Sequence, residues 1–335
     1  MSLAEDARAR HVPDRLTGRA TRVLRSWEVR LLLVGVAVFA ANAWASPYFL
    51  SPWNLSDATF NFTEKAMIAF AVALLVVAGE IDLSVAAILA LCSTAMGLAL
   101  QHGAGTPALV ATGLGVGLLC GAVNGLLVTR AGLPSIVVTI GTMSLFRGLS
   151  YVVLGDGAFN GYPASFAVFG QGYAWWVVTW EMVIFLALAL LFGVLLHATS
   201  FGRQVFVVGN NPTAAAFSGV RVGRVKMILF LLTGLMAGLA AVCLTSRLGS
   251  TRPSIAQGWE LEVVTMVVLG GVSILGGSGS IGGVALAAVV MGMVTFGLGL
   301  LNVPGIVVSI VVGALLIAVI AVPRLVRLLR TGRAT

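Results

Sequence analysis

PALVATGLGVGLLCGAVNGLLV, residues 107–128, contains 22 residues and no charged side chain. A helix of roughly 20 apolar residues crosses a bilayer core about 30 Å thick, so this stretch predicts a membrane-spanning helix. A glycine recurs at every fourth residue on one helical face, where a second helix backbone can approach closely. These glycines are Gly113, Gly117, Gly121 and Gly125. We therefore expect close packing of this helix against a neighbour.

The composition of the whole chain agrees with this interpretation. The chain has 335 residues with a mean hydropathy of +1.04 and 10% charged residues, whereas soluble domains have about 25%. This excludes a soluble globular protein, and the predicted fold class is an all-α polytopic membrane protein.

Apolar windows of this kind follow one another along nearly the whole chain. We count about ten membrane-spanning helices, of which the second and the eighth are short. The windows are residues 31–49, 66–79, 83–100, 107–128, 134–154, 174–196, 227–245, 261–275, 281–301 and 303–322.

The positions of Lys and Arg predict cytoplasmic N- and C-termini, because cationic segments remain on the cytoplasmic side. Residues 1–30 hold seven arginines. With ten crossings, the outer segments carry only Lys65, Arg247 and Arg252. The predicted organisation is a basic cytoplasmic segment (1–30), a transmembrane domain (31–322) and a basic cytoplasmic tail (323–335). The net charge of +8 follows from this topology, and nucleic acid is not an expected partner.

The longest polar interruption, residues 197–226, carries four cations and no carboxylate on the predicted cytoplasmic side. A turn signal at residues 209–212 precedes the helix-forming stretch Thr213–Phe217, which Ser218 and Gly219 close. This pattern predicts a short cytoplasmic helix suited to docking a partner. The alternative is a plain connecting loop.

Two hydrophobic segments are interrupted in comparable places of the two halves. EIDLS (80–84) follows one short apolar run, and the glycine-rich stretch 270–283 follows another. Broken helices of this kind mark the substrate region of many transporters, although ordinary loops are the alternative. The candidate translocation path contains Asp82, Ser84, Asn124, Ser273, Gly276 and Gly277.

The predicted external segment 246–260 carries two arginines, Arg247 and Arg252, against the charge rule. Contact with a partner or a substrate explains them. The alternative is a structural clamp in which they pair with Glu260 and Glu262.

Several classes of function find no support in the sequence. Gly277, Gly279 and Gly282 fit G-x-G-x-x-G, but no strand precedes them, so we reject a dinucleotide site. The sequence has no phosphate-binding loop, metal-ligand spacing or catalytic constellation, so we expect no cofactor and no enzyme activity. The carboxylates considered, Glu181 among them, fall at predicted helix ends, which weakens an ion-coupled secondary transporter without removing it.

Four segments of the sequence stand out as a set. They are GEIDLSV (79–85), GAVNGLLV (121–128), the stretch from Pro134 to Gly148, and the loop from Phe201 to Gly219. Together they resemble the permease subunits of ribose-type ABC sugar importers. Within that family, residues 244–271 and 146–156 most resemble L-rhamnose importer permeases. Autoinducer-2 importer permeases are similar too, and ribose or another pentose is a further alternative.

The resemblance implies a multi-pass permease in the bacterial cytoplasmic (inner) membrane that works by alternating access. Its implied partners are two ATP-binding-cassette domains, a second permease subunit (identical or paralogous) and a periplasmic or extracellular sugar-binding protein, with membrane lipid around them. Arg247, Arg252 and Glu260 become candidate contacts for the binding protein. The loop at about 201–226 becomes the ATPase-coupling element, with Gly202, Arg203, Gly209, Asn210, Asn211, Ala214, Ala215, Phe217, Ser218 and Gly219.

Overall fold

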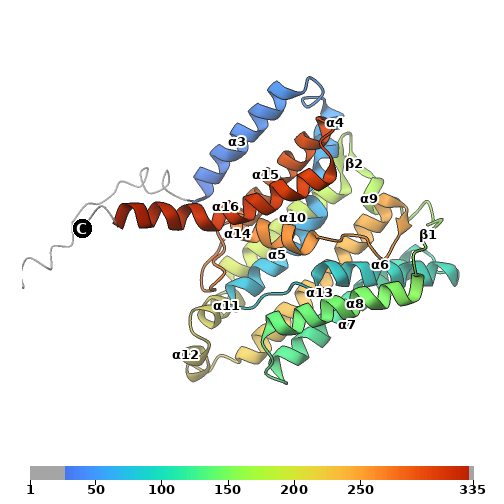
Figure 1. Ribbon diagram of the computed structural model, residues 1–335. Coiled ribbons are helices and arrows are strands. Elements are labelled where there is room, and N and C mark those ends of the chain that lie inside the picture. The colour runs from blue at the N-terminus through green and yellow to red at the C-terminus, as the bar shows by residue number, and fades with distance from the viewer. Residues whose placement is uncertain (1–26, 332–335) are drawn as a thin grey trace, which may run out of the picture.

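The computed structural model describes residues 27–331, which form a bundle of apolar helices (Figure 1). Residues 1–26 of the predicted basic segment and 332–335 of the predicted tail lie outside the described residues. The long helices are α3 (Trp27–Ala45), α5 (Thr63–Val77), α6 (Val85–Gln101), α7 (Thr106–Thr129), α8 (Ser135–Leu154), α10 (Trp180–Ala198), α13 (Val222–Leu248), α14 (Trp259–Leu269), α15 (Ile281–Leu300) and α16 (Gly305–Thr331). The remaining helices are α4 (Pro52–Thr59), α9 (Val168–Gln171), α11 (Ser200–Asn210) and α12 (Pro212–Phe217).

Each predicted apolar window coincides with one of the long helices. By length and composition, seven described helices are suited to cross a membrane, and α6 and the start of α16 are shorter apolar helices. The chain is therefore an all-α polytopic membrane protein, as predicted. The window 174–196 began too early, because its first residues form a hairpin of β2 (Tyr173–Trp175) and β3 (Val178–Thr179).

Helix α5 lies at the centre of the bundle. No residue from Ala66 to Val77 is more than 4% exposed, because α10, α13, α14 and α15 all pack against this helix. Its uniformly apolar sequence suits a helix that is buried on every side.

The pair α7 and α13 forms the most extensive helix contact of the bundle. A methyl group on Gly117 would overlap the carbonyl oxygen of Gly234, and one on Gly121 would overlap that of Phe230. The predicted glycine face therefore does pack against another helix, and its partner is α13.

The connections between helices gather at two opposite ends of the bundle. Residues 78–84, 199–221 and 270–280 share the end that the charges predict to be cytoplasmic, and α11 and α12 lie there, at the lower left of Figure 1. We call this the predicted cytoplasmic end. The predicted external end carries α4, α9 and the short strand pair of β1 (Phe159–Asn160) with β4 (Ser250–Thr251).

Candidate functional site

Three segments that the sequence indicated separately meet at the predicted cytoplasmic end. The backbone nitrogen of Gly277 donates to the carbonyl oxygen of Val77 at 2.8 Å. The side-chain nitrogen of Asn210 donates to the carbonyl oxygen of Gly277 at 3.3 Å. The end of α5, the end of α11 and the connection 270–280 are therefore tied together. We call Val77, Gly79, Gly209, Asn210, Gly276 and Gly277 the cytoplasmic junction.

Glycine is required at the centre of the cytoplasmic junction. A methyl group on Gly209 would overlap the carbonyl oxygen of Val77 and press on the nitrogen of Gly277. Gly276 and Gly277 have φ angles of +83° and +75°, in the left-handed region that side chains disfavour. The glycines that break the apolar pattern of the sequence thus allow three backbones to touch.

The predicted coupling loop contains two helices. The short helix expected at Thr213–Phe217 is present as α12, and its first turn is capped by the Asn211 side chain, which accepts from the Ala214 nitrogen at 3.0 Å. Phe217 is 90% exposed, whereas Ala215 is buried. Ala214, Ser218 and Gly219 are exposed.

The sequence did not predict the second helix, α11, which includes Gly202, Arg203, Gly209 and Asn210. Thr199 caps it by accepting from the Gly202 nitrogen at 3.1 Å. Residues 201–210 are therefore helical rather than a loop. The capping threonine and the buried face of Gly202, Val205 and Val208 are the signals that could have revealed this helix.

A buried polar cluster lies between α6, α7 and α13. Asp82 accepts hydrogen bonds from the Ser84 hydroxyl at 2.6 Å and from the Thr233 hydroxyl at 3.3 Å. Asn124 donates to the Ser84 hydroxyl oxygen at 2.8 Å. None of Asp82, Ser84 and Asn124 is more than 1% exposed, and the Asn124 side-chain oxygen has no hydrogen-bond partner among the described residues. We call Asp82, Ser84, Asn124 and Thr233 the polar cluster.

The six predicted path residues thus fall into two groups. Asp82, Ser84 and Asn124 belong to the polar cluster, whereas Ser273, Gly276 and Gly277 lie in the connection 270–280 at the cytoplasmic junction. The segment 77–84 links the two groups, because Gly79 packs against Gly276 only a few residues before Asp82. An ion pair between Glu80 and Lys226 also attaches this segment to α13.

At the predicted external end, a buried ion pair changes the interpretation of Arg247. Its guanidinium donates to both carboxylate oxygens of Glu64, at 2.8 and 2.9 Å. The Glu64 side chain is fully buried, and the Arg247 side chain is 28% exposed. The alternative clamp with Glu260 and Glu262 is wrong in its partners, because Arg247 pairs with Glu64. This pair joins α5 to α13.

Sequence reasoning did not predict the partners of the acidic and basic residues near this pair. Lys65 binds Glu262 at 2.6 Å, and the Thr63 hydroxyl donates to Glu181 at 2.8 Å. Glu181 is buried in the first turn of α10. The adjacent charges of Glu64 and Lys65 beside an apolar run were the available signal.

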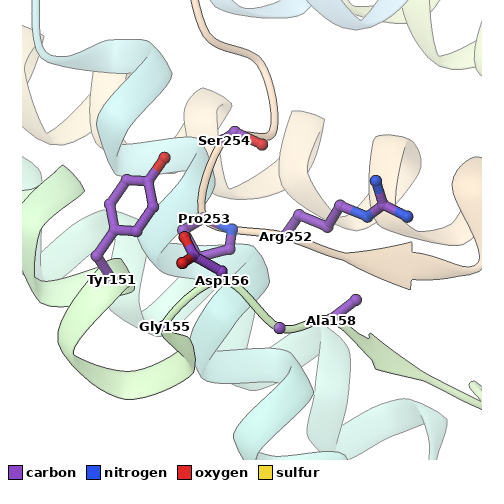
Figure 2. A pocket seen from close by; sticks show the side chains of 8 residues that line it. Tyr151, Gly155, Asp156, Ala158, Arg252, Pro253 and Ser254 are labelled. Carbon is purple, nitrogen blue, oxygen red and sulfur yellow. The ribbon is translucent and has the colours of Figure 1, made fainter.

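Arg252 lies at an open pocket of the predicted external end, with a volume of about 360 Å³. Figure 2 shows the side chains of Tyr151, Asp156 and Arg252 around it. Arg147 fixes the adjoining loop by donating to the carbonyl oxygens of Pro253 and Ile255, both at 2.7 Å. Glu260, at the start of α14, is partly exposed.

The structure is a polytopic helical bundle. At its predicted cytoplasmic end, the exposed helix α12 lies next to the interrupted segments 78–84 and 270–280, an arrangement that suits a transport permease. A family model described as "Branched-chain amino acid transport system / permease component" matches residues 54–320. The ribose import permease protein RbsC of Bacillus subtilis (strain 168) is 35% identical over 281 residues, which are 83% of this chain and 87% of that protein. The autoinducer 2 import system permease protein LsrD of Escherichia coli (strain K12) is 34% identical over 305 residues, which are 89% and 92%. No solved structure matches the chain.

The chain belongs to the permease family whose model matches residues 54–320. It is a multi-pass protein of the inner membrane and a transport component rather than an enzyme.

Proposed function

We propose that this chain is the permease subunit of an ABC sugar importer whose cargo is L-rhamnose. The two relatives named above, a ribose permease and an autoinducer-2 permease, support import of a small polyhydroxylated molecule. The resemblance of residues 146–156 and 244–271 to L-rhamnose importer permeases favours that sugar, and autoinducer-2 and ribose are the alternative cargoes.

The cytoplasmic junction is the observation that carries the proposed mechanism. In this mechanism α12 sits in a groove of a partner ATPase, with Phe217 and Ala214 as exposed contacts. Because Asn210 at the end of α11 binds Gly277, and Gly277 binds Val77, movement of α11 and α12 pulls directly on α5 and on the connection 270–280. ATP-driven movement of this kind would alternate access to the path.

The predicted external end receives a sugar-binding protein in this mechanism. Arg252 is exposed beside the carboxylate-bearing pocket that Arg147 supports, and Glu260 is partly exposed, so both are available to a partner. Arg247 is a weaker candidate, because its guanidinium is held by Glu64. A second permease subunit, identical or paralogous, completes the proposed assembly with two ATPase domains.

Reconstitution in liposomes tests the cargo and the mechanism together. The chain would be co-purified with its candidate ATPase and binding protein, and ATP hydrolysis measured with L-rhamnose, ribose or autoinducer-2. We expect hydrolysis to rise only with the rhamnose-loaded binding protein. If another cargo stimulates ATP hydrolysis, that cargo replaces L-rhamnose in the proposal. Uptake driven by an ion gradient without an ATPase would overturn the proposal that the chain belongs to an ABC importer.

The substitution Ala214→Arg tests docking through α12. Ala214 is exposed, so the variant is expected to fold and to lose both ATPase co-purification and transport because the added side chain blocks the groove. Gln101→Arg places the same side chain on an exposed position at the opposite end of the bundle and should leave both unchanged. Undiminished coupling in Ala214→Arg would contradict docking through this helix.

A further inference from the structure

A second pocket lies beside the coupling element, between α11, the end of α12 and the first turns of α13. Its volume is about 370 Å³, and its polar lining includes Arg221, Arg224 and Gln204. No carboxylate lines it. Among the described residues, neither arginine belongs to an ion pair, and the neighbouring Glu80 is already paired with Lys226. The pocket therefore presents two uncompensated cations.

Another part of the wall of this pocket is apolar and continues along a membrane helix. It contains Phe201 from α11 and Val225 and Ile228 from α13. Ile228 lies seven residues beyond Arg221, or about 10 Å along the helix axis. Because α13 is suited to cross the membrane, the direction from Arg221 to Ile228 leads from the predicted cytoplasmic surface into the bilayer.

We propose that this pocket binds an anionic phospholipid of the cytoplasmic leaflet. Its phosphate lies between Arg221 and Arg224, and an acyl chain lies along Ile228. The forked guanidinium group matches the geometry of phosphate oxygens, and basic pockets between membrane helices on the cytoplasmic side accept anionic headgroups. The inference does not depend on which cargo the permease carries.

The composition of the wall favours a lipid over an acidic segment of a partner ATPase. A protein segment at the cytoplasmic surface matches the two arginines but leaves the apolar wall toward Ile228 uncovered. Phe217, which is highly exposed, does not line the pocket. A lipid at this place contacts α11, the segment 218–221 that follows α12, and α13 at once, and so holds the coupling element against the bundle.

Native mass spectrometry of the purified full-length chain tests the proposal. The chain would be equilibrated in mild detergent with equal amounts of phosphatidylglycerol and phosphatidylcholine, and the retained lipids counted. We expect the wild-type chain to prefer phosphatidylglycerol. Arg221→Gln and Arg224→Gln should each lower that preference about fivefold, which corresponds to about 1 kcal/mol for one cation near an anionic headgroup.

Arg130→Gln is the matched control, because it removes one exposed cation from the same end of the bundle but outside the pocket. It should keep the preference. The charge-conserving variants Arg221→Lys and Arg224→Lys should each lose less of the preference than the matching glutamine variant, because lysine keeps the charge but lacks the guanidinium fork. Melting temperatures would establish that all variants fold. Equal retention of the two lipids by the wild-type chain would overturn the proposal. So would a double glutamine variant that keeps its phosphatidylglycerol but no longer binds the ATPase, which would assign the pocket to that partner.

Discussion

Arg247 illustrates how a single buried acid determines what a neighbouring cation can do. The charge rule identified it as an external cation available to a partner. In the structure its guanidinium is committed to Glu64, which lies 183 positions earlier in the chain. No local pattern indicates that the start of α5 and the end of α13 are neighbours, so this pair was not predictable from one sequence.

The substitution Arg247→Ala should destabilise the fold. It leaves the fully buried Glu64 carboxylate without its cation, and loss of one partner of a buried ion pair typically costs about 3–5 kcal/mol. Thermal unfolding in detergent, followed by tryptophan fluorescence, would measure the effect. Arg252→Ala removes an exposed arginine that forms no described ion pair and serves as the control. Equal melting temperatures for the two variants would show that the Glu64 contact contributes nothing.

The substitution Gly209→Ala should uncouple transport from ATP hydrolysis. The added methyl group overlaps the Val77 carbonyl oxygen, so the end of α11 must move away from α5 and the connection 270–280. We expect the ATPase to remain bound, because α12 is unchanged, while substrate-stimulated hydrolysis falls. Gly193→Ala on α10 meets nothing within 4 Å and should behave like the wild-type chain. Normal stimulation in Gly209→Ala would exclude the cytoplasmic junction as the transmitting contact.

At the scale of elements, apolar length and cation positions were sufficient to find the membrane helices. These two signals did not reveal α11. Its sequence mixes polar and apolar residues, as in a helix at the protein surface, and the cations of residues 197–226 favoured a cytoplasmic loop. The two signals also placed the start of α10 too early, because the aromatic residues at 173–176 are as apolar as a membrane helix but pair as a hairpin. Hydropathy alone does not distinguish a surface helix from a loop, or an aromatic hairpin from the start of a membrane helix.

The glycine face of α7 offers an element-scale prediction with a control on the same helix. Gly121→Ala should destabilise the α7–α13 contact, because the methyl group would overlap the Phe230 carbonyl oxygen and lie 3.2 Å from the Cα atom of Leu231. Overpacking of this kind costs about 1–3 kcal/mol. Gly115→Ala on the opposite face meets nothing within 4 Å and should be neutral in the same thermal unfolding assay. Equal melting temperatures for the two variants would contradict close packing at Gly121, because helix propensity favours alanine over glycine and so cannot mask the overlap at one position alone.

At the scale of the whole molecule, the sequence placed the path residues in two interrupted segments but did not show their relation. The structure separates them into a polar cluster in the interior and a surface connection at the cytoplasmic junction. The segment 77–84 belongs to both groups, because Val77 and Gly79 contact the connection and Asp82 and Ser84 form the cluster. In the proposed mechanism, a movement that begins at α12 would therefore pass through the contacts of α11 with Val77 and Gly277 to the segment 77–84, and so to the buried hydrogen bonds of Asp82.

This continuity predicts accessibility that depends on the transport state. In a background lacking the three buried cysteines, Ser273→Cys should react with aqueous thiol reagents in the resting assembly, since Ser273 is partly exposed. Ser84→Cys should be protected there, because Ser84 is fully buried, and should become reactive when ATP is bound or turned over. Labelling kinetics in liposomes, followed by mass spectrometry, would measure both positions.

Ser93→Cys provides the control for this experiment. Ser93 is also fully buried, but its hydroxyl bonds to Thr245 and Thr251 outside the predicted path, so it should stay protected in every state. Opening at Ser84 but not at Ser93 would locate the change at the polar cluster instead of in general loosening of the bundle. The contrary result is that Ser84→Cys stays protected in all states and Ser273→Cys is labelled equally in all of them. It would show that the polar cluster only packs the core and that the path lies elsewhere in the bundle.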